Sequence, residues 1–467
     1  MSEVVNKLWG FCNTLRHDGM GYGDYIEQLT YLLFLKMAQE KGVTLPEGCD
    51  WNTLKVKSGT DLSDAYADTL RILSRQKSTL GDIFAGSLSK FREPVNLKKL
   101  IMMIDETQWT AIDVDIKADA YEGLLQKYAE EEKGAGQYFT PREAIRCIVR
   151  CIRPDIRGKP NLTVHDPAVG TAGFLIGAYE WMMRQTKEGA TLSREERDRL
   201  QHRTFSGGEI VLDTRRLALM NLYLHEIDDG IYFGDSLAEG PHSSKRYDIV
   251  MTNPPFGSKG AGESPLRDDF TVKTSNKQFN FVQHVVNILK PGGRAAMVVP
   301  DNVLFEENAG KEIRKLLLTD CNLHTILRLP VGTFTPYAPG VKANIIFFEK
   351  GEPTKEVWIY DNRTGIEKVT IRHPLTTEYF EDFEKCYHAK SRRESERFKR
   401  KTIKEIEDGG FNLDITWMKD EWVRDNESLR DPSDLVSEAL NQLTNATDSL
   451  SEVALKLETE RRSGNGK

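Results

Sequence analysis

The middle of the chain predicts an α/β fold, in which a doubly wound and mostly parallel sheet carries helices on both faces. Short apolar runs alternate with helical patterns between residues 162 and 349, the order expected of parallel strands joined by crossover helices. Four of these runs end in turns rich in glycine, proline or acidic residues. Because ligands bind at the carboxyl ends of the strands in such sheets, these turns predict a ligand site.

Seven strands are predicted, over residues 162–166, 205–210, 231–235, 248–253, 295–300, 323–329 and 343–349. Between them lie helical patterns over residues 140–150, from residue 171 onward, and over residues 213–225 and 279–289. We assign this sheet domain to residues 134–360.

The chain is long enough for two or three domains, with 467 residues of which 29% are charged and 39% hydrophobic. No apolar run has the length of a membrane span, and the first residues lack the basic and apolar regions of a signal peptide. We therefore expect a cytoplasmic protein without membrane contact. The net charge of −7 is unfavourable for gripping a DNA duplex unaided, so a nucleic-acid enzyme of this kind would need a partner.

Residues 1–133 predict a helical domain. Ile26, Leu29, Leu33 and Met37 recur at three- and four-residue steps and form one apolar stripe. A charged and glycine-rich stretch near residues 127–136 then marks the boundary to the sheet domain. The six cysteines are scattered and have no histidine or second cysteine pair at metal spacing, so we expect reduced thiols and no metal; a zinc site is the disfavoured alternative.

A helix start directly follows the boundary. Thr140 is predicted to cap it, with Pro141 at its first position and Glu143 completing a capping box. The positively polarised N-terminus suits a ligand carboxylate. A loop with two aromatic residues thus leads into this helix N-terminus, over Gln137, Tyr138, Phe139, Thr140, Pro141 and Arg142.

The turns after the first three strands carry small and acidic residues. In the first, Asp166 can meet a cationic or hydroxylated ligand, and the turn lacks the G-x-G-x-x-G pattern of dinucleotide sites. Glu209 after the second strand can accept hydrogen bonds from ribose hydroxyls, and Asp235 after the third can accept from an adenine amino group. The candidate ligand residues of these turns are Asp166, Gly170, Thr171, Ala172, Gly173, Glu209, Asp235 and Ser236.

The fourth strand stops abruptly at the turn Asn253-Pro254-Pro255-Phe256, because proline cannot continue it. A carboxamide, a backbone carbonyl and an aromatic ring are thereby expected at the carboxyl end of a buried strand. Together they suit a planar group that bears an amine, such as a nucleobase. The alternative is a Pro-Pro loop with a buried phenylalanine.

Two further segments follow the sheet domain. Residues 361–431 form a C-terminal extension with a basic stretch that either contacts nucleic acid or is the solvated face of a helix: Lys390, Arg392, Arg393, Arg397, Lys399, Arg400, Lys401 and Lys404. Residues 432–467 predict a helix for subunit contact, with a coiled-coil seam formed by Val436, Leu440, Leu443, Thr447, Leu450, Ala454 and Leu457.

The motif at residues 166–175, together with the turn at residues 253–256, resembles the amino-group DNA methyltransferases that use S-adenosylmethionine. Residues 137–142 narrow the resemblance to the modification subunits of type I restriction-modification systems, and residues 220–225 and 411–415 are also similar to that family. The likeness covers nearly the whole chain. One departure is Ala172: the motif commonly reads Gly-Thr-Gly-Gly, and Ala172 stands where its third residue is glycine.

The resemblance implies a class I S-adenosylmethionine-dependent methyltransferase sheet with a reversed last strand, and transfer of methyl to adenine N6 in double-stranded DNA. It implies a specificity subunit that reads the DNA sequence, bound by two copies of the modification subunit; a restriction subunit can join them. Asn253, Pro254, Pro255 and Phe256 would be catalytic. The segment from Gln137 to Arg142 and the residues named in the turns after the first three strands would bind the cofactor. Two alternatives remain: methylation of a protein glutamine or other amine, and a non-catalytic scaffold.

Overall fold

A computed structural model describes residues 10–11, 15, 19–109, 140–159, 161–225, 227, 230–257, 265–335, 338, 340–370 and 372–414. Gln137, Tyr138 and Phe139 lie outside the described residues, as does the predicted seam in residues 432–467. The chain divides into two compact units, one comprising Met1–Phe139 with Leu212–Asp229 and the other Thr140–Val211 with Gly230–Lys467.

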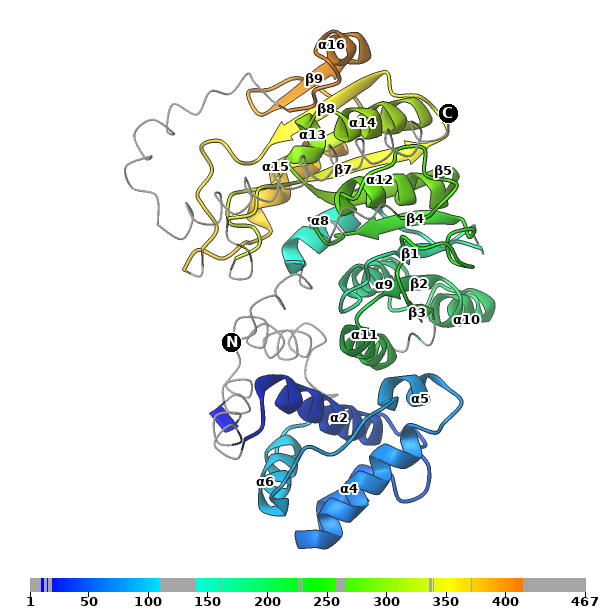
Figure 1. Cartoon of the computed structure of the whole chain (residues 1–467), viewed down its shortest axis with the longest axis vertical. Helices are drawn as coiled ribbons and strands as arrows, with labels where there is room; N and C mark the ends of the chain where they lie inside the picture. The colour runs from blue at the N-terminus through cyan, green and yellow to red at the C-terminus, as the bar shows by residue number, and fades with distance from the viewer. Residues whose placement is uncertain are drawn as a thin grey trace, which may run out of the picture. The chain divides into compact units, whose positions relative to one another are not determined.

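The first unit is helical (Figure 1), with α2 (Tyr22–Glu40), α3 (Trp51–Val56), α4 (Gly59–Leu73), α5 (Thr79–Phe84), α6 (Pro94–Asp105) and α11 (Leu212–Leu224). Asp105 joins three of these helices, since its carboxylate accepts from Lys36 at 3.0 Å and from the Trp51 indole at 2.8 Å. Although burial opposes it, the hydrogen bonds from Lys55, Trp51 and Lys36 lower the pKa of Asp105 to about 2.

Helix α11 belongs to this unit although the sequence places it among the strands of the sheet domain. It packs against α2 and α5, and its buried Arg216 donates to Glu27 and to the Ala85 carbonyl, each at 2.7 Å. The predicted helix over residues 213–225 is therefore confirmed, but its neighbours are the N-terminal helices.

The second unit contains a nine-stranded sheet in the order β3-β2-β1-β4-β5-β7-β6-β8-β9. The strands are β1 (Val164–Asp166), β2 (Phe205–Glu209), β3 (Ile231–Phe233), β4 (Tyr247–Thr252), β5 (Leu289–Pro300), β6 (Cys321–Arg328), β7 (Ala343–Lys350), β8 (Glu356–Asp361) and β9 (Phe398–Thr402). Strands β1 to β5 pair in parallel, whereas β7 runs antiparallel between β5 and β6. The seven predicted strands and the reversed strand of the methyltransferase sheet are confirmed.

Helices cover both faces of this sheet (Figure 1): α8 (Arg142–Ile152), α9 (Gly173–Gln185), α10 (Arg194–His202), α12 (Lys277–Ile288), α13 (Asn302–Phe305), α14 (Ala309–Asp320), α15 (Glu378–Tyr387) and α16 (Ile403–Asp408). Successive strand residues point to opposite faces, and β7 shows this directly. Phe348 packs in the core with α12 and α14, whereas Phe347 contacts Phe383 and Tyr387 of α15. The predicted doubly wound α/β class is confirmed.

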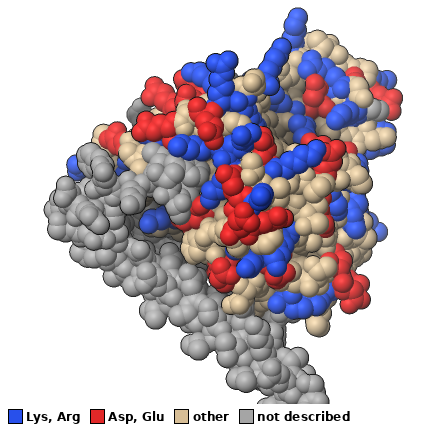
Figure 2. All heavy atoms as spheres, turned by 90° about the horizontal axis from the view of Figure 1, so that it is seen from above, with Lys and Arg blue, Asp and Glu red and all other residues tan. Residues whose placement is uncertain are grey.

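The sheet extends beyond residue 360, because β9 pairs antiparallel with β8. The basic stretch therefore lies partly on a strand, and its reading as the face of a helix is wrong. Arg392 donates to the His324 carbonyl and Arg397 to the Thr364 carbonyl, so these two cations hold the fold. Lys and Arg side chains are interspersed with Asp and Glu over the face shown in Figure 2.

The outer edge of β9 is capped by side chains. The N–H groups of Phe398, Arg400 and Thr402 face away from β8, since the alternating bonds of the antiparallel pair use the residues between them. Each N–H donates to a nearby side chain: to Ser395 at 3.1 Å, to Glu394 at 3.1 Å and to Glu405 at 2.7 Å.

Within the part of the chain that the structure describes, no helix combines the length and the apolar character that crossing a membrane requires.

Candidate active site

The carboxyl ends of β1, β2, β3 and β4 meet at one edge of the sheet, because these strands are adjacent and parallel. Asp166, Glu209, Asp235 and Asn253 are at or directly after these four ends. The sequence prediction that these residues share one edge is therefore confirmed.

The turn after β1 is buried and linked to β2. Asp166 is 1% exposed, accepts from the Ala168 N–H at 3.0 Å, and has its pKa raised to about 7 by burial. Gly170 has a φ of 53° and donates its N–H to Glu209 at 3.1 Å. The turn thus presents an acid that binding of a cation would help to ionise.

Ala172 and Gly173 begin α9 and have different roles. Ala172 is fully buried with a φ of 70°, a left-handed conformation that glycine adopts without the cost that alanine bears. A Cβ on Gly173 would lie 2.7 Å from Cδ1 of Ile145 on α8. Gly173 thus makes room for helix packing, a role that the predicted cofactor contact did not include. Thr171 is buried beside them.

Glu209 is 6% exposed, and both of its carboxylate oxygens accept backbone N–H groups, from Val211 at 2.9 Å and from Gly170 at 3.1 Å. Burial raises the pKa of Glu209. Each oxygen retains a lone pair that can accept a ligand hydroxyl. The preceding Gly208 serves packing, since a Cβ there would lie 2.4 Å from the Tyr232 hydroxyl.

The loop after β3 is fastened to the turn after β1. The Ser236 hydroxyl donates to the Pro167 carbonyl at 2.5 Å and lies 2.7 Å from the Tyr232 hydroxyl. Asp235 accepts the Leu237 N–H at 2.9 Å. The Ser236 side chain, expected to bind a ligand, thus holds the two ligand loops together.

Two apolar side chains at this edge were not identified from the sequence. Ile210 directly follows Glu209 and is 59% exposed, and Phe233, paired in register with Glu209, is 57% exposed. Exposed apolar side chains beside hydrogen-bond acceptors can hold a flat ring such as adenine. A sequence pattern predicts which residues are apolar, but these two could be distinguished from core residues only by their exposure.

The start of α8 differs from its prediction. The helix begins at Arg142 with Pro141 at the cap position and no side-chain cap, so the predicted capping box is wrong. Glu143 instead accepts from Arg146 at 2.7 Å and from Thr377 at 2.8 Å. The Thr140 hydroxyl accepts a hydrogen bond from Nδ2 of Asn253 at 3.0 Å, which accounts for its absence from the cap.

The turn after β4 presents Asn253 with one half of its carboxamide hydrogen-bonded and the other half without a partner in the part of the chain that the structure describes. Nδ2 is bonded to Thr140, whereas Oδ1 is buried and has no hydrogen-bond partner among the described residues. Pro254 is buried, and Pro255 and Phe256 are half-buried. An isolated buried acceptor of this kind is suited to a donor on a ligand.

Helix α12 fixes the other end of this turn. The Gly257 N–H donates to the Gln278 side chain at 3.0 Å, and the Gly257 carbonyl accepts the Lys277 N–H at 2.9 Å. Gln278 was not identified from the sequence. The available signal was its polar side chain in a helix that is buried almost throughout.

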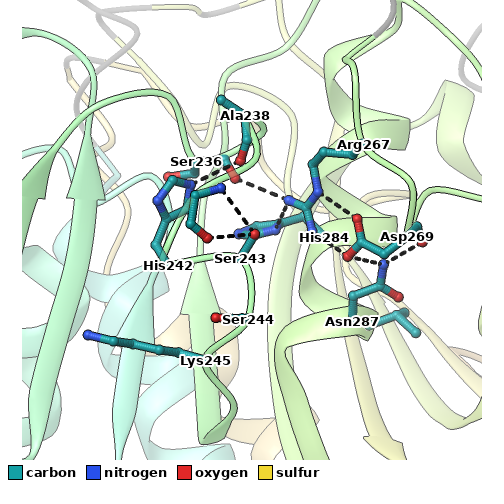
Figure 3. A network of polar contacts seen from close by, with 12 residues as sticks. Ser236, Ala238, His242, Ser243, Ser244, Lys245, Arg267, Asp269, His284 and Asn287 are labelled. Atoms are coloured by element: carbon teal, nitrogen blue, oxygen red, sulfur yellow. Dashed lines mark hydrogen bonds and ion pairs between the residues drawn. The ribbon is translucent and has the colours of Figure 1, made fainter.

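A buried arginine lies between α12 and the loop after β3 (Figure 3). Arg267 donates to Asp269 at 2.7 and 2.6 Å, to Nδ1 of His284 at 2.8 Å and to the Ser236 carbonyl at 3.3 Å. This network therefore touches the same loop that carries Asp235.

Comparisons with known proteins agree with these features. The N-6 DNA Methylase family model matches residues 112–425, and the HsdM N-terminal domain model matches residues 4–43. The chain is 39% identical to the type I restriction enzyme StySJI methylase subunit of Salmonella typhimurium and, also at 39%, to the EcoKI methylase subunit of Escherichia coli. Each alignment covers 96% of this chain and 94% of the relative.

Solved structures give the same result. A chain from a study of complex assembly in the type I restriction-modification system has a TM-score of 0.74 and 29% identity, covering 98% of this chain and 99% of that one. The EcoKI M protein has a TM-score of 0.55 and 34% identity, with coverage of 98% and 96%. The resemblance found in the sequence is thus confirmed: the chain belongs to the N-6 DNA methylase family and, within it, to the methylase subunits of type I restriction enzymes.

Proposed function

We propose that this chain is the modification subunit of a type I restriction-modification complex and transfers the methyl group of S-adenosylmethionine to N6 of adenine in double-stranded DNA. The observation that carries the proposal is Oδ1 of Asn253, a buried acceptor without a partner among the described residues. Leaving such an atom unpaired costs about 1–3 kcal/mol, which a donor amine on the substrate would offset.

The chemistry requires help for a poor nucleophile, because the lone pair of adenine N6 is delocalised into the ring. Oδ1 of Asn253 and the Pro254 carbonyl would accept the two hydrogens of the amine and draw its nitrogen towards tetrahedral geometry. These acceptors bind more strongly as positive charge develops on nitrogen, so they stabilise the transition state more than the ground state. One N6 proton is then released to solvent water, which leaves a neutral methylated amine.

The base must leave the duplex to reach the edge of the sheet. Phe256 is half-buried beside Asn253 and would stack on it, a contact worth about 1–3 kcal/mol. The Thr140 hydroxyl would hold the Asn253 carboxamide with its oxygen towards the amine.

The residues at the first three strand ends fit the proposed cofactor, which supplies an electrophilic methyl group on a cationic sulfonium. Asp166, Glu209 and Asp235 provide acidic groups for the cation, the ribose hydroxyls and the adenine amine, respectively. Ile210 and Phe233 would flank the adenine ring. Of the predicted cofactor residues, Gly173 and Ser236 are proposed to act through packing and loop position.

We further propose that a specificity subunit reads the DNA sequence, that two copies of this chain bind it, and that a restriction subunit can join them. The names of the relatives as methylase subunits of type I restriction enzymes support these partners. Family membership also favours DNA over a protein glutamine as the substrate, and the acceptor set at the strand ends argues against a non-catalytic scaffold.

The decisive experiment uses the complex with a specificity subunit from the same host, unmethylated host DNA and cofactor labelled in its methyl group. We expect N6-methyladenine in digests of the product. Asn253→Ala should lower the rate by at least about 100-fold, as loss of a transition-state contact does elsewhere, while calorimetry shows cofactor binding retained. Asn52→Ala, at an exposed position on α3, is the matched control. Label in cytosine or in protein, or full turnover by Asn253→Ala, would refute the proposal.

A further inference from the structure

Arg267 is a buried cation in residues 265–276, the segment that leads into α12. It is 2% exposed, and its guanidinium lies over the Phe270 ring at 4.2 Å. Two of its nitrogens donate to the two carboxylate oxygens of Asp269, at 2.7 and 2.6 Å. This bidentate pair fixes the plane of the guanidinium (Figure 3).

The third nitrogen points away from Asp269 and has two contacts. It donates to Nδ1 of His284 at 2.8 Å and to the Ser236 carbonyl at 3.3 Å. Nδ1 can accept only in the neutral imidazole, and burial together with the charge of Arg267 lowers the pKa of His284. The ring therefore remains an acceptor at neutral pH, and Arg267 is held from two sides.

Polar side chains of α12 hold the rest of the segment. Gln283 both accepts from the Val272 N–H at 2.9 Å and donates to the Val272 carbonyl at 2.8 Å. Asn280 donates to the Thr274 carbonyl at 2.8 Å, and Asn287 to the Asp269 carbonyl at 2.8 Å. Arg267 thus extends from a segment bonded to α12 at several points, so its own position is well defined.

The loop that Arg267 reaches is part of the proposed cofactor site. Ser236 follows Asp235, and its hydroxyl donates to the Pro167 carbonyl in the turn after β1. A shift of the Ser236 carbonyl would therefore move both the acid after β3 and the turn that contains Asp166. A guanidinium can bind a carboxylate, an imidazole and a carbonyl together because its five N–H groups form a fixed fork; an ammonium cannot reproduce that geometry.

We propose that Arg267 is a positioning residue that holds the loop of Asp235 and Ser236 in the conformation that binds the adenine end of the cofactor. The inference rests on the proposed function. It assigns a role in cofactor binding to Arg267, which lies in the segment after the Asn253 turn and contacts the loop of Asp235 and Ser236.

The test compares Arg267→Met and Arg267→Lys with the unchanged chain, in complex with the specificity subunit. Calorimetry gives the Kd for S-adenosylmethionine, and steady-state assays give kcat and separate KM values for cofactor and DNA. Arg267→Met should raise the Kd at least tenfold, with a much smaller change in the KM for DNA. Arg267→Lys should also raise the Kd, since it keeps the charge but loses the fork, and it serves alone if Arg267→Met does not fold.

Arg314→Met is the matched control. Arg314 is equally buried, at 1% exposure, and donates to the carbonyls of Phe411 and Glu306, far along the chain from the cofactor loops. It should lower stability and leave the Kd for the cofactor unchanged. An unchanged Kd in both Arg267 variants would overturn the inference, as would an equal rise in Arg314→Met. Failure of the unchanged complex to bind S-adenosylmethionine would instead overturn the proposed function.

Discussion

Replacing Thr140 with valine removes the hydroxyl that contacts Asn253 and puts a methyl group of similar size in its place. In the structure this hydroxyl accepts from Nδ2 of Asn253 at 3.0 Å, and the opposite atom of the carboxamide, Oδ1, is left for the substrate amine. Without the hydroxyl, the Asn253 carboxamide can rotate by half a turn and present its NH2 group to the substrate amine. Both groups are then donors, so no hydrogen bond forms between them.

The size of the effect follows from the single bond lost. A net hydrogen bond contributes about 0.5–1.5 kcal/mol, and about 1.4 kcal/mol corresponds to a factor of ten in rate. We therefore expect Thr140→Val to lower the rate of methyl transfer by about 2- to 10-fold. Asn253→Ala should lower it much more, because that variant removes the acceptor itself.

The assay is single-turnover methyl transfer at saturating cofactor and DNA, with calorimetry of cofactor binding alongside. Thr140→Val should slow transfer and leave the Kd of the cofactor unchanged, and Thr140→Ser should restore the rate because it retains a hydroxyl. A raised Kd with a normal rate at saturation would show that the hydroxyl serves the cofactor, as predicted from the sequence. A normal rate and a normal Kd would show that it serves neither.

Two further predictions concern the turn after β1. Burial raises the pKa of Asp166 from 3.8 to about 7, so the stability associated with its protonated form is fully present below pH 3.8 and is lost as pH rises through 7. Relative to Asp166→Asn, the free energy of unfolding should fall between pH 4 and pH 8 by up to about 4 kcal/mol; parallel pH profiles in urea denaturation would contradict this. Ala172 is fully buried with a φ of 70°. Ala172→Gly should change the free energy of unfolding by less than about 1 kcal/mol, whereas Ala172→Val should lower it by more than about 2 kcal/mol. An unchanged free energy of unfolding in Ala172→Val would refute backbone strain at this position.

The parts of the site that depend on local pattern were predictable. Strand ends follow from apolar runs and turn residues, so Asp166, Glu209, Asp235 and Asn253 could be assigned to one sheet edge. The roles of the glycines were harder to predict. In a sequence, a glycine that leaves room for a ligand cannot be distinguished from one that leaves room for a neighbouring side chain. Gly208 faces the Tyr232 hydroxyl, which only the packed structure reveals.

Contacts between distant segments were beyond the sequence. Thr140 and Asn253 are separated by 113 positions. The preference of threonine for helix caps predicted that Thr140 would bond to the start of its own helix, whereas it bonds to Asn253. Arg216 links α11 to the N-terminal helices by donating to the Glu27 carboxylate and the Ala85 carbonyl. The spacing of apolar residues in the sequence does not predict such contacts. Strand β9 was missed because its lysines and arginines suggest a solvated surface, whereas its pairing with β8 depends on the backbone.

The capped edge of β9 has a consequence for how subunits can join this chain. An open sheet edge is a template on which a strand of another molecule can add, whether in an ordered complex or in an aggregate. Here the three outward N–H groups already have partners in Ser395, Glu394 and Glu405, and an incoming strand would have to displace all three. Strand addition at β9 is thereby disfavoured, both for a strand of a partner subunit and for edge-to-edge polymerisation through this strand.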